Sequence, residues 1–175
     1  MPFYPGPGIG GHCIGVDPIF LSWKAKTQGT DLHFIELARR MNAEMPRYIV
    51  EQAVFNLNRH SGKAISRSSV MILGVSYKKD VSDVRESPAL EILMGLKHLG
   101  AKLSYHDPMV PVLKHENLRL VSLPLTEHNL RKQDLVILCT NHTKVRYKKV
   151  VDHSRLIYDT RNQLKGFQSK NIVRL

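Results

Sequence analysis

Two short, almost wholly apolar runs, Ser69–Gly74 (SVMILG) and Leu135–Cys139 (LVILC), constrain the fold of this chain most strongly. Runs of this kind, bounded by turn signals, are typical of strands that are buried on both faces of a sheet. A helix is expected between them, from Ala89 to Leu99, with Ser87 as its cap. This alternation across residues 68–175 predicts an α/β fold, a parallel sheet with covering helices. Further short strands are expected at residues 102–105, 118–121, 156–158 and 172–173, and weak helices at 126–131 and 145–150.

The chain before residue 63 has a helical pattern instead. Asp17-Pro18 predicts a helix start, with Asp17 as the cap and Pro18 in the first helical position. A longer helix is expected from about Asp31 to Arg59, because apolar residues recur there at three- and four-residue steps. Pro46 lies inside this pattern, so we expect it to kink the helix or to start a new one.

Composition limits the class of protein. The 175 residues carry a formal charge of +11, which favours anionic partners. The basic residues form no stripe with interleaved aromatics, so we expect no nucleic-acid binding. No apolar run approaches the ~20 residues that cross a bilayer, and we expect neither a secretory signal nor a membrane partner. Two cysteines are too few for a disulfide framework, which favours a cytoplasmic location.

The stretch PGPGIGGHCIGVDP, residues 5–18, predicts a shaped loop with a reactive thiol. Its glycines let a ligand approach the main chain closely, and its prolines stiffen it. Cys13 lies just before the predicted helix start, where the positive end of the helix dipole stabilises a thiolate. Asp17, one turn later, is placed to orient a water or take a proton. A buried structural cysteine in a glycine-rich turn is the alternative, and a metal site at His12-Cys13 is disfavoured because adjacent residues seldom ligate one ion.

A second loop, YKKDVSDVRESP at residues 77–88, joins the end of a predicted strand to a helix start. Ligands of open α/β sheets bind beyond the carboxyl ends of strands, and helix N-termini hold anions. Lys78, Lys79 and Arg85 add positive charge, so a phosphorylated ligand is one interpretation. A solvated basic loop is the other, because no complete G-x-G-x-x-G fingerprint follows the strand. Cys139, at the end of an apolar strand, is interpreted as a buried structural thiol.

Four segments occur in order along the chain: FYPGPGIGGHCIGVDPIFLSWKAK, FIELARRMNAEMPRYIV, LGVSYKKDVSDVRESPALEIL and YDTRNQL. Together they resemble the nucleotide-sugar 6-dehydrogenases, which act on UDP-glucose, UDP-N-acetylmannosamine or UDP-N-acetylglucosamine. The details GPGIGGHC, DPIFLSWKA and YKKDVSDVRESP look most like the bacterial UDP-N-acetylglucosamine 6-dehydrogenases.

The resemblance implies an organisation and an activity. Residues 1–62 would be the cysteine loop and a central dimerisation helix, and residues 63–175 a Rossmann-like UDP-binding domain. The family oxidises the sugar C6 alcohol to a carboxylate in two NAD-linked steps, through a cysteine thiohemiacetal and thioester. Its NAD-binding domain precedes the cysteine loop. We therefore expect this chain to be the C-terminal portion, with that domain absent, and to be inactive alone. A non-catalytic UDP-sugar-binding or subunit-association module is the alternative.

The resemblance also implies residue roles. Cys13 and Asp17 would be the catalytic pair. Gly15 departs from the proline or alanine common in the family, so we expect a looser turn there. NAD would lie against Cys13, Ile14, Gly15, Val16 and Arg85. The substrate, a UDP-N-acetylhexosamine or another UDP-sugar, would contact Tyr4, Gly6, Gly8, Ile9, Gly10, Tyr77, Lys78 and Arg161.

Overall fold

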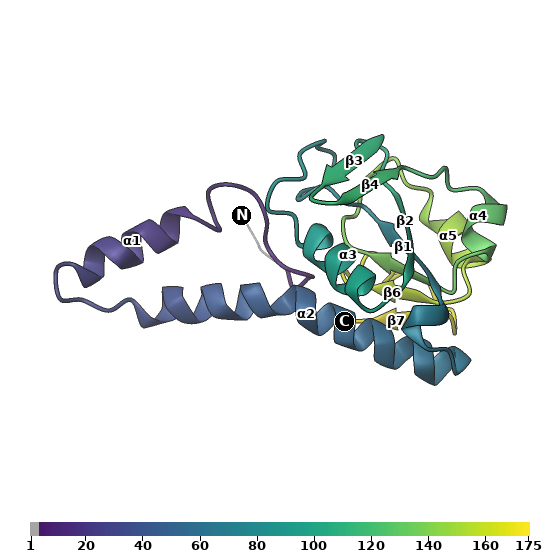
Figure 1. Cartoon of the computed structure of the whole chain (residues 1–175), viewed down its shortest axis with the longest axis horizontal. Coiled ribbons are helices and arrows are strands. Elements are labelled where there is room, and N and C mark those ends of the chain that lie inside the picture. Colours follow the sequence, from purple (N-terminus) through teal and green to yellow (C-terminus); the bar gives the residue numbers. More distant parts are fainter. Residues whose placement is uncertain (1–3) are drawn as a thin grey trace.

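The computed structural model describes residues 4–175, and its centre is a five-stranded sheet (Figure 1). Every pairing in this sheet is parallel, which confirms the predicted α/β class. The order is β2-β1-β5-β6-β7, so the chain crosses over between non-neighbouring strands. The strands are β1 (Ser69–Leu73), β2 (Lys102–His106), β5 (Leu135–Leu138), β6 (Ile157–Asp159) and β7 (Ile172–Arg174).

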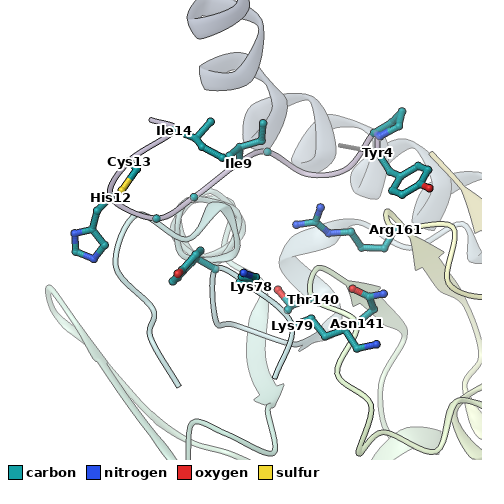
Figure 2. Close-up of a pocket in the computed structure, with 15 residues that line it drawn as sticks. Tyr4, Ile9, His12, Cys13, Ile14, Lys78, Lys79, Thr140, Asn141 and Arg161 are labelled. Carbon is teal, nitrogen blue, oxygen red and sulfur yellow. The ribbon is translucent and has the colours of Figure 1, made fainter. Parts of the chain in front are cut away.

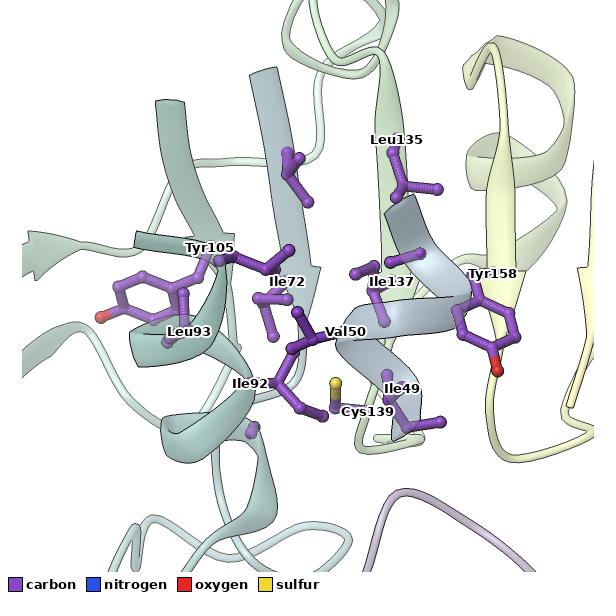
Figure 3. Close-up of a cluster of buried hydrophobic side chains, with 14 of the residues drawn as sticks. Ile49, Val50, Ile72, Ile92, Leu93, Tyr105, Leu135, Ile137, Cys139 and Tyr158 are labelled. Atoms are coloured by element: carbon purple, nitrogen blue, oxygen red, sulfur yellow. The ribbon is translucent and has the colours of Figure 1, made fainter. Parts of the chain in front are cut away.

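Side chains of the central strands alternate between two separate cores. Ile72 and Ile137 face the helices α2 (His33–Ser61) and α3 (Pro88–His98), as Figure 3 shows. Met71 and Val136 face the other side, which α4 (Glu127–Arg131) and α5 (Tyr147–His153) cover. Successive residues of a strand point to opposite faces, so a strand covered on both sides must be apolar throughout. This burial is the physical reason for the SVMIL and LVIL runs.

A small antiparallel hairpin lies outside the main sheet. Its strands are β3 (Val112–His115) and β4 (Leu118–Val121), joined at Glu116, which adopts a φ of 48°. Only the second of these strands was expected from the sequence. The first escapes because Leu113 alone of its residues is buried, which leaves too short an apolar pattern to recognise.

Two helices precede the sheet, α1 (Asp17–Lys26) and α2. Figure 1 shows α1 and the first half of α2 extending away from the sheet, while the second half of α2 lies against it. Ile49, Ala53 and Leu57 of that second half are completely buried. Among the described residues, no helix combines the length and the hydrophobicity that a membrane span requires.

Two expectations about where these helices begin were wrong in detail. The cap of α1 is Val16, whose carbonyl accepts the first helical hydrogen bonds, and Asp17 lies inside the first turn. The longer helix begins at His33 after Leu32, not at Asp31. Of the two alternatives at Pro46, a new helix is excluded, because α2 runs through this residue without interruption. Packing of the following turns against the sheet offsets the hydrogen bond that proline cannot donate. Ser87 caps α3 as predicted, accepting a bond from the Ala89 N–H.

Candidate functional site

The glycine-rich loop passes over the carboxyl ends of three parallel strands and encloses a pocket of about 470 Å³. In Figure 2, Cys13 lies at one end of this loop segment and Tyr4 at the other. Ligands bind at this edge in open α/β sheets, because the loops after the strands converge there. The lining residues are Tyr4, Pro5, Gly8, Ile9, Gly10, Gly11, His12, Cys13 and Ile14 of the loop, Tyr77, Lys78 and Lys79 after β1, Thr140 and Asn141 after β5, and Arg161 after β6.

This pocket brings together most of the residues expected to bind substrate. Tyr4, Gly8, Ile9 and Gly10 line it together with Tyr77, Lys78 and Arg161, although these two sets are far apart in the sequence. The reactive-loop prediction and the basic-loop prediction therefore describe one site.

Close approach explains why glycine stands at two loop positions. A Cβ on Gly6 would lie 2.5 Å from Nη1 of Arg161, so Gly6 contacts the arginine directly. A Cβ on Gly10 would lie 2.9 Å from the Cβ of Tyr77 and would overlap the Glu86 carbonyl. A side chain at Gly10 would push the loop away from the strand ends, because it meets backbone, whereas one at Gly6 would displace the Arg161 guanidinium or the loop.

Arg161 is held with its guanidinium directed toward the glycine-rich loop (Figure 2). Its Nε donates to the Cys139 carbonyl at 2.7 Å, and its backbone N–H donates to Asp159 Oδ1 at 3.1 Å. Burial lowers the pKa of Arg161 from its ordinary value. No carboxylate of residues 4–175 forms an ion pair with it. A desolvated, unpaired guanidinium is suited to an anionic ligand such as a phosphate.

The two cysteines have opposite environments. Cys13 is exposed, and its carbonyl accepts the N–H groups of Val16 at 3.1 Å and of Asp17 at 2.8 Å, so it lies immediately before α1 as expected. Cys139 is buried among apolar side chains, and burial raises the pKa of its thiol to about 12, in agreement with the structural interpretation. Asp17 is exposed at the start of α1 and does not line the pocket that contains Cys13.

The residues expected to bind NAD are separated by the structure. Ile14, Gly15 and Val16 line a second pocket of about 500 Å³, which lies between the loop and the helices α1 and α2. Arg85 lines neither pocket. Its guanidinium donates to Asp83 through Nε at 3.0 Å and Nη2 at 2.7 Å, and these bonds hold the pKa of Asp83 well below its usual value.

Several residues that shape the site were not expected from the sequence. Asn42 of α2 binds the backbone of Ile9, and Asp107 and His142 form a buried network beneath the basic loop. Asp107 directly follows β2, and His142 lies in the loop that begins after β5 ends at Leu138. Both are thus beyond the carboxyl end of a strand, where the rule already applied to the basic loop would have found them. Asn42 sits in a helix and gives no comparable signal. No group of three or more His, Cys, Asp or Glu within residues 4–175 is arranged to hold a metal ion.

Comparison with known families gives two matches. The UDP-glucose/GDP-mannose dehydrogenase family, UDP binding domain, matches residues 71–166. The central domain of the same family matches residues 1–44.

Individual relatives agree with these matches. The chain is 31% identical over 169 residues to UDP-N-acetyl-D-mannosamine dehydrogenase of Methanococcus maripaludis, covering 97% of this chain and 36% of that protein. It is 29% identical to UDP-N-acetyl-D-glucosamine 6-dehydrogenase of Salmonella typhi, covering 97% and 40%. The solved structure of UDP-D-ManNAc dehydrogenase from Pyrococcus horikoshii superposes with a TM-score of 0.77 at 26% identity, covering 98% and 40%. The chain thus spans well under half the length of these relatives.

Proposed function

Since this chain belongs to the UDP-glucose/GDP-mannose dehydrogenase family, we propose that it supplies the nucleotide-sugar side of a UDP-sugar 6-dehydrogenase. Residues 1–62 provide the cysteine loop and the central helical segment, and residues 63–175 provide the UDP-binding domain. The relatives carry the names of different N-acetylhexosamines at similar identity, so a UDP-N-acetylhexosamine is the substrate class that we propose.

One observation carries this proposal: the exposed thiol of Cys13 shares a pocket with Tyr77, Lys78 and Arg161. Lys78 and Arg161 bring positive charge to bind the diphosphate, and Arg161 already lacks a carboxylate partner among the described residues. Tyr77 and the loop backbone then cover the sugar. In the proposed arrangement, the C6 end of the ligand lies toward Cys13, at the opposite end of the pocket from Tyr4.

Cys13 acts as the nucleophile in the proposed reaction. Its thiolate adds to the carbon of a C6 aldehyde, and the resulting oxyanion takes up a proton to give a thiohemiacetal. Loss of a hydride from that carbon and of the hydroxyl proton gives a thioester. Water then attacks the thioester carbonyl, the carbon–sulfur bond breaks, and a carboxylate and the free thiol are released. Asp17, in the first turn of α1, is the proposed base for this water, although its side chain lies outside the pocket lining in the present structure.

NAD is the hydride acceptor that the proposal requires for both oxidations. The wall next to Cys13 fits a flat aromatic ring, because Ile14 and Val16 line it with apolar surface and Gly15 leaves it open. A Cβ on Gly15 would meet only the Gly11 carbonyl, at 3.7 Å. Arg85 would have to leave Asp83 before it could pair with a cofactor phosphate.

Calorimetry with UDP and with UDP-N-acetylglucosamine tests the ligand. We expect both to bind the 175-residue chain, and Arg161→Ala to weaken binding by about tenfold or more, the loss of a charge-assisted bond. Arg67→Ala, at an exposed position near the opposite end of β1, is the matched control and should bind normally. Normal binding by Arg161→Ala would contradict the proposed site.

Alkylation by iodoacetamide tests whether the ligand reaches the thiol. UDP-N-acetylglucosamine at saturation should slow the alkylation of Cys13, because the sugar covers the sulfur. Unchanged alkylation at saturation would favour the non-catalytic binding module. We expect little or no NADH formation from this chain with NAD and UDP-N-acetylglucosamine, because the dehydrogenases it matches extend well beyond the shared region.

Self-association through the central helical segment is part of the proposal. Large apolar side chains are exposed on α1 and on the outer half of α2, among them Trp23 at 64% and Phe34 at 89%. Bare apolar surface of this extent marks an interface. Light scattering should therefore detect a dimer or larger species, and a monodisperse monomer would contradict this part.

A further inference from the structure

The imidazole of His142 is completely buried directly beneath the basic loop, two residues beyond the pocket residue Thr140. Its Nδ1 accepts the backbone N–H of Asp80 at 3.0 Å. A backbone N–H can only donate, so Nδ1 carries no proton and the ring proton lies on Nε2. Nε2 is 3.0 Å from Oδ2 of Asp107, to which it donates, and 3.1 Å from the hydroxyl of Ser76. His142 therefore links a buried carboxylate on one side to the backbone of the basic loop on the other.

Asp107 is fixed by further bonds and holds the ring in turn. Its Oδ2 accepts the N–H groups of Val75 at 2.8 Å and Ser76 at 3.1 Å, and its Oδ1 accepts that of Met109 at 2.8 Å. Burial alone would raise the pKa of Asp107, but the hydrogen bonds from His142, Met109 and Val75 outweigh burial and keep it below its usual value. An ionised carboxylate in this position fixes the Nε2–H form of the imidazole.

The far end of the loop needs this support. Asp80 has a φ of 60°, a left-handed conformation that costs a residue other than glycine free energy. Besides the bond to His142, its carboxylate accepts the N–H of Thr143 at 2.9 Å and the Thr143 hydroxyl at 2.8 Å. Thr140 donates its hydroxyl to the carbonyl of Ser76 at 2.6 Å. The segment after β5 thus forms hydrogen bonds with both ends of residues 76–80.

Lys78 and its neighbour Lys79 project from residues 76–80 into the pocket (Figure 2). The loop has no regular secondary structure, so its shape depends on these side-chain bonds together with the backbone bond from the Tyr77 N–H to the Asp83 carbonyl at 3.0 Å.

We propose that His142 is a positioning residue, which fixes the backbone from Ser76 to Asp80 so that Tyr77 and Lys78 are presented to the nucleotide sugar. The inference rests on the proposed function, since it assigns His142 to the same ligand site. The contact that matters for binding is the one between Nδ1 and the Asp80 N–H. The contacts of Nε2 with Asp107 and with the Ser76 hydroxyl hold the ring in place and contribute to stability.

Two substitutions separate these contacts. His142→Asn keeps an acceptor oxygen near the position of Nδ1 and loses the reach to Asp107, whereas His142→Gln keeps a donor near Nε2 and loses the acceptor for Asp80. Calorimetry with UDP should show affinity within about threefold of the unsubstituted chain for the Asn variant and a loss of about tenfold for the Gln variant. Both should lower the melting temperature. His128→Gln, at an exposed position on α4, is the matched control.

The outcomes distinguish the inference from the proposed function. If the unsubstituted chain binds no UDP, both are overturned. If it binds UDP but the two variants keep their affinity, or lose it in proportion to their stability, only the inference is overturned. Nitrogen NMR of the unsubstituted chain adds a measurement that does not depend on folding of the variants. It should report a neutral His142 with its proton on Nε2, and a proton on Nδ1 would overturn the inference.

Discussion

Asn42 of α2 binds both backbone polar groups of Ile9 in the glycine-rich loop. The Ile9 N–H donates to Oδ1 of Asn42 at 2.7 Å, and Nδ2 of Asn42 donates to the Ile9 carbonyl at 3.2 Å. The Asn42 amide thus forms the two hydrogen bonds that a neighbouring strand would form with the backbone of an extended residue. It holds the middle of the loop, between Tyr4 and Cys13, against the helix.

Asn42→Ala should free this part of the loop. Each net hydrogen bond contributes about 1 kcal/mol, so we expect UDP-N-acetylglucosamine affinity to fall by roughly tenfold and the Ile9 amide to lose protection against hydrogen exchange. Asn42→Asp keeps the acceptor for the Ile9 N–H and should give an intermediate result. Unchanged exchange at Ile9 in the Ala variant would show that the loop is held by other contacts.

Thiol labelling should distinguish the two cysteines. Cys13 is exposed and should react with a disulfide reagent in the native chain, whereas Cys139 is buried, with its thiol pKa raised to about 12, and should react only after unfolding. We expect one thiol to react without denaturant and two in urea. Cys13→Ala should abolish the native reaction, and Cys139→Ala should leave it intact. A second reactive thiol in the native chain would contradict this packing.

Gly10→Ala should displace the loop from the strand ends. The new methyl group would meet the Tyr77 side chain and the Glu86 backbone, which cannot both move away. Such overpacking costs about 1–3 kcal/mol, so UDP-sugar affinity should fall by roughly tenfold or more. Gly166→Ala is the control, because nothing lies within 4 Å of the added carbon. Equal affinity for the two variants would show that the loop adapts freely.

Asp134 should make folding sensitive to acid. Burial alone would raise its pKa, but Lys63 Nζ at 2.7 Å, the Ser69 N–H at 3.0 Å and Arg155 lower it below the ordinary value. A group whose pKa is depressed in the folded state stabilises it above the unfolded value of about 3.9, and this stabilisation is lost as the pH falls through the folded value.

Urea unfolding at two pH values measures this contribution. Asp134→Asn should lower the free energy of unfolding by about 1–3 kcal/mol at pH 7, and the difference from the unsubstituted chain should shrink as the pH is lowered from the unfolded value of about 3.9. Asp152→Asn removes an exposed pair with Lys148 and should change the free energy by less than about 1 kcal/mol at either pH. A difference for Asp134→Asn that is independent of pH would contradict the assigned charge.

The parts of the fold that could be predicted are those where burial imposes an unbroken chemical pattern. SVMIL and LVIL lie in strands covered on both faces, so their nearly unbroken apolar sequence predicts buried strands. The strand β3 has only one buried residue, so its sequence has no apolar pattern from which a strand could be predicted. The start of α1 was predicted at the wrong residue for a different reason. A helix cap is defined by backbone geometry, and Val16 occupies the cap position without any side-chain hydrogen bond that the sequence could reveal.

The site could be predicted in the same uneven way. Cys13 and the glycine-rich loop identify themselves by composition, and Lys78 by its place after a strand. The crossover connections bring residues 77 and 161 to the same edge of the sheet, and packing of the glycine-rich loop against α2 and the strand ends brings Cys13 to that edge. Asn42 acts through a loop more than thirty residues earlier in the chain, and no local pattern marks such a contact.

Because α2 continues through Pro46, its projecting half and its buried half belong to one uninterrupted helix. One end of this helix is fixed in the core by Ile49, Ala53 and Leu57, and the other projects beyond the sheet. Asn42, which binds Ile9, lies in the projecting half of α2, between the start of the helix and its buried half. A displacement of the projecting half of α2 would therefore move Asn42, and with it the point at which the loop that carries Cys13 is held.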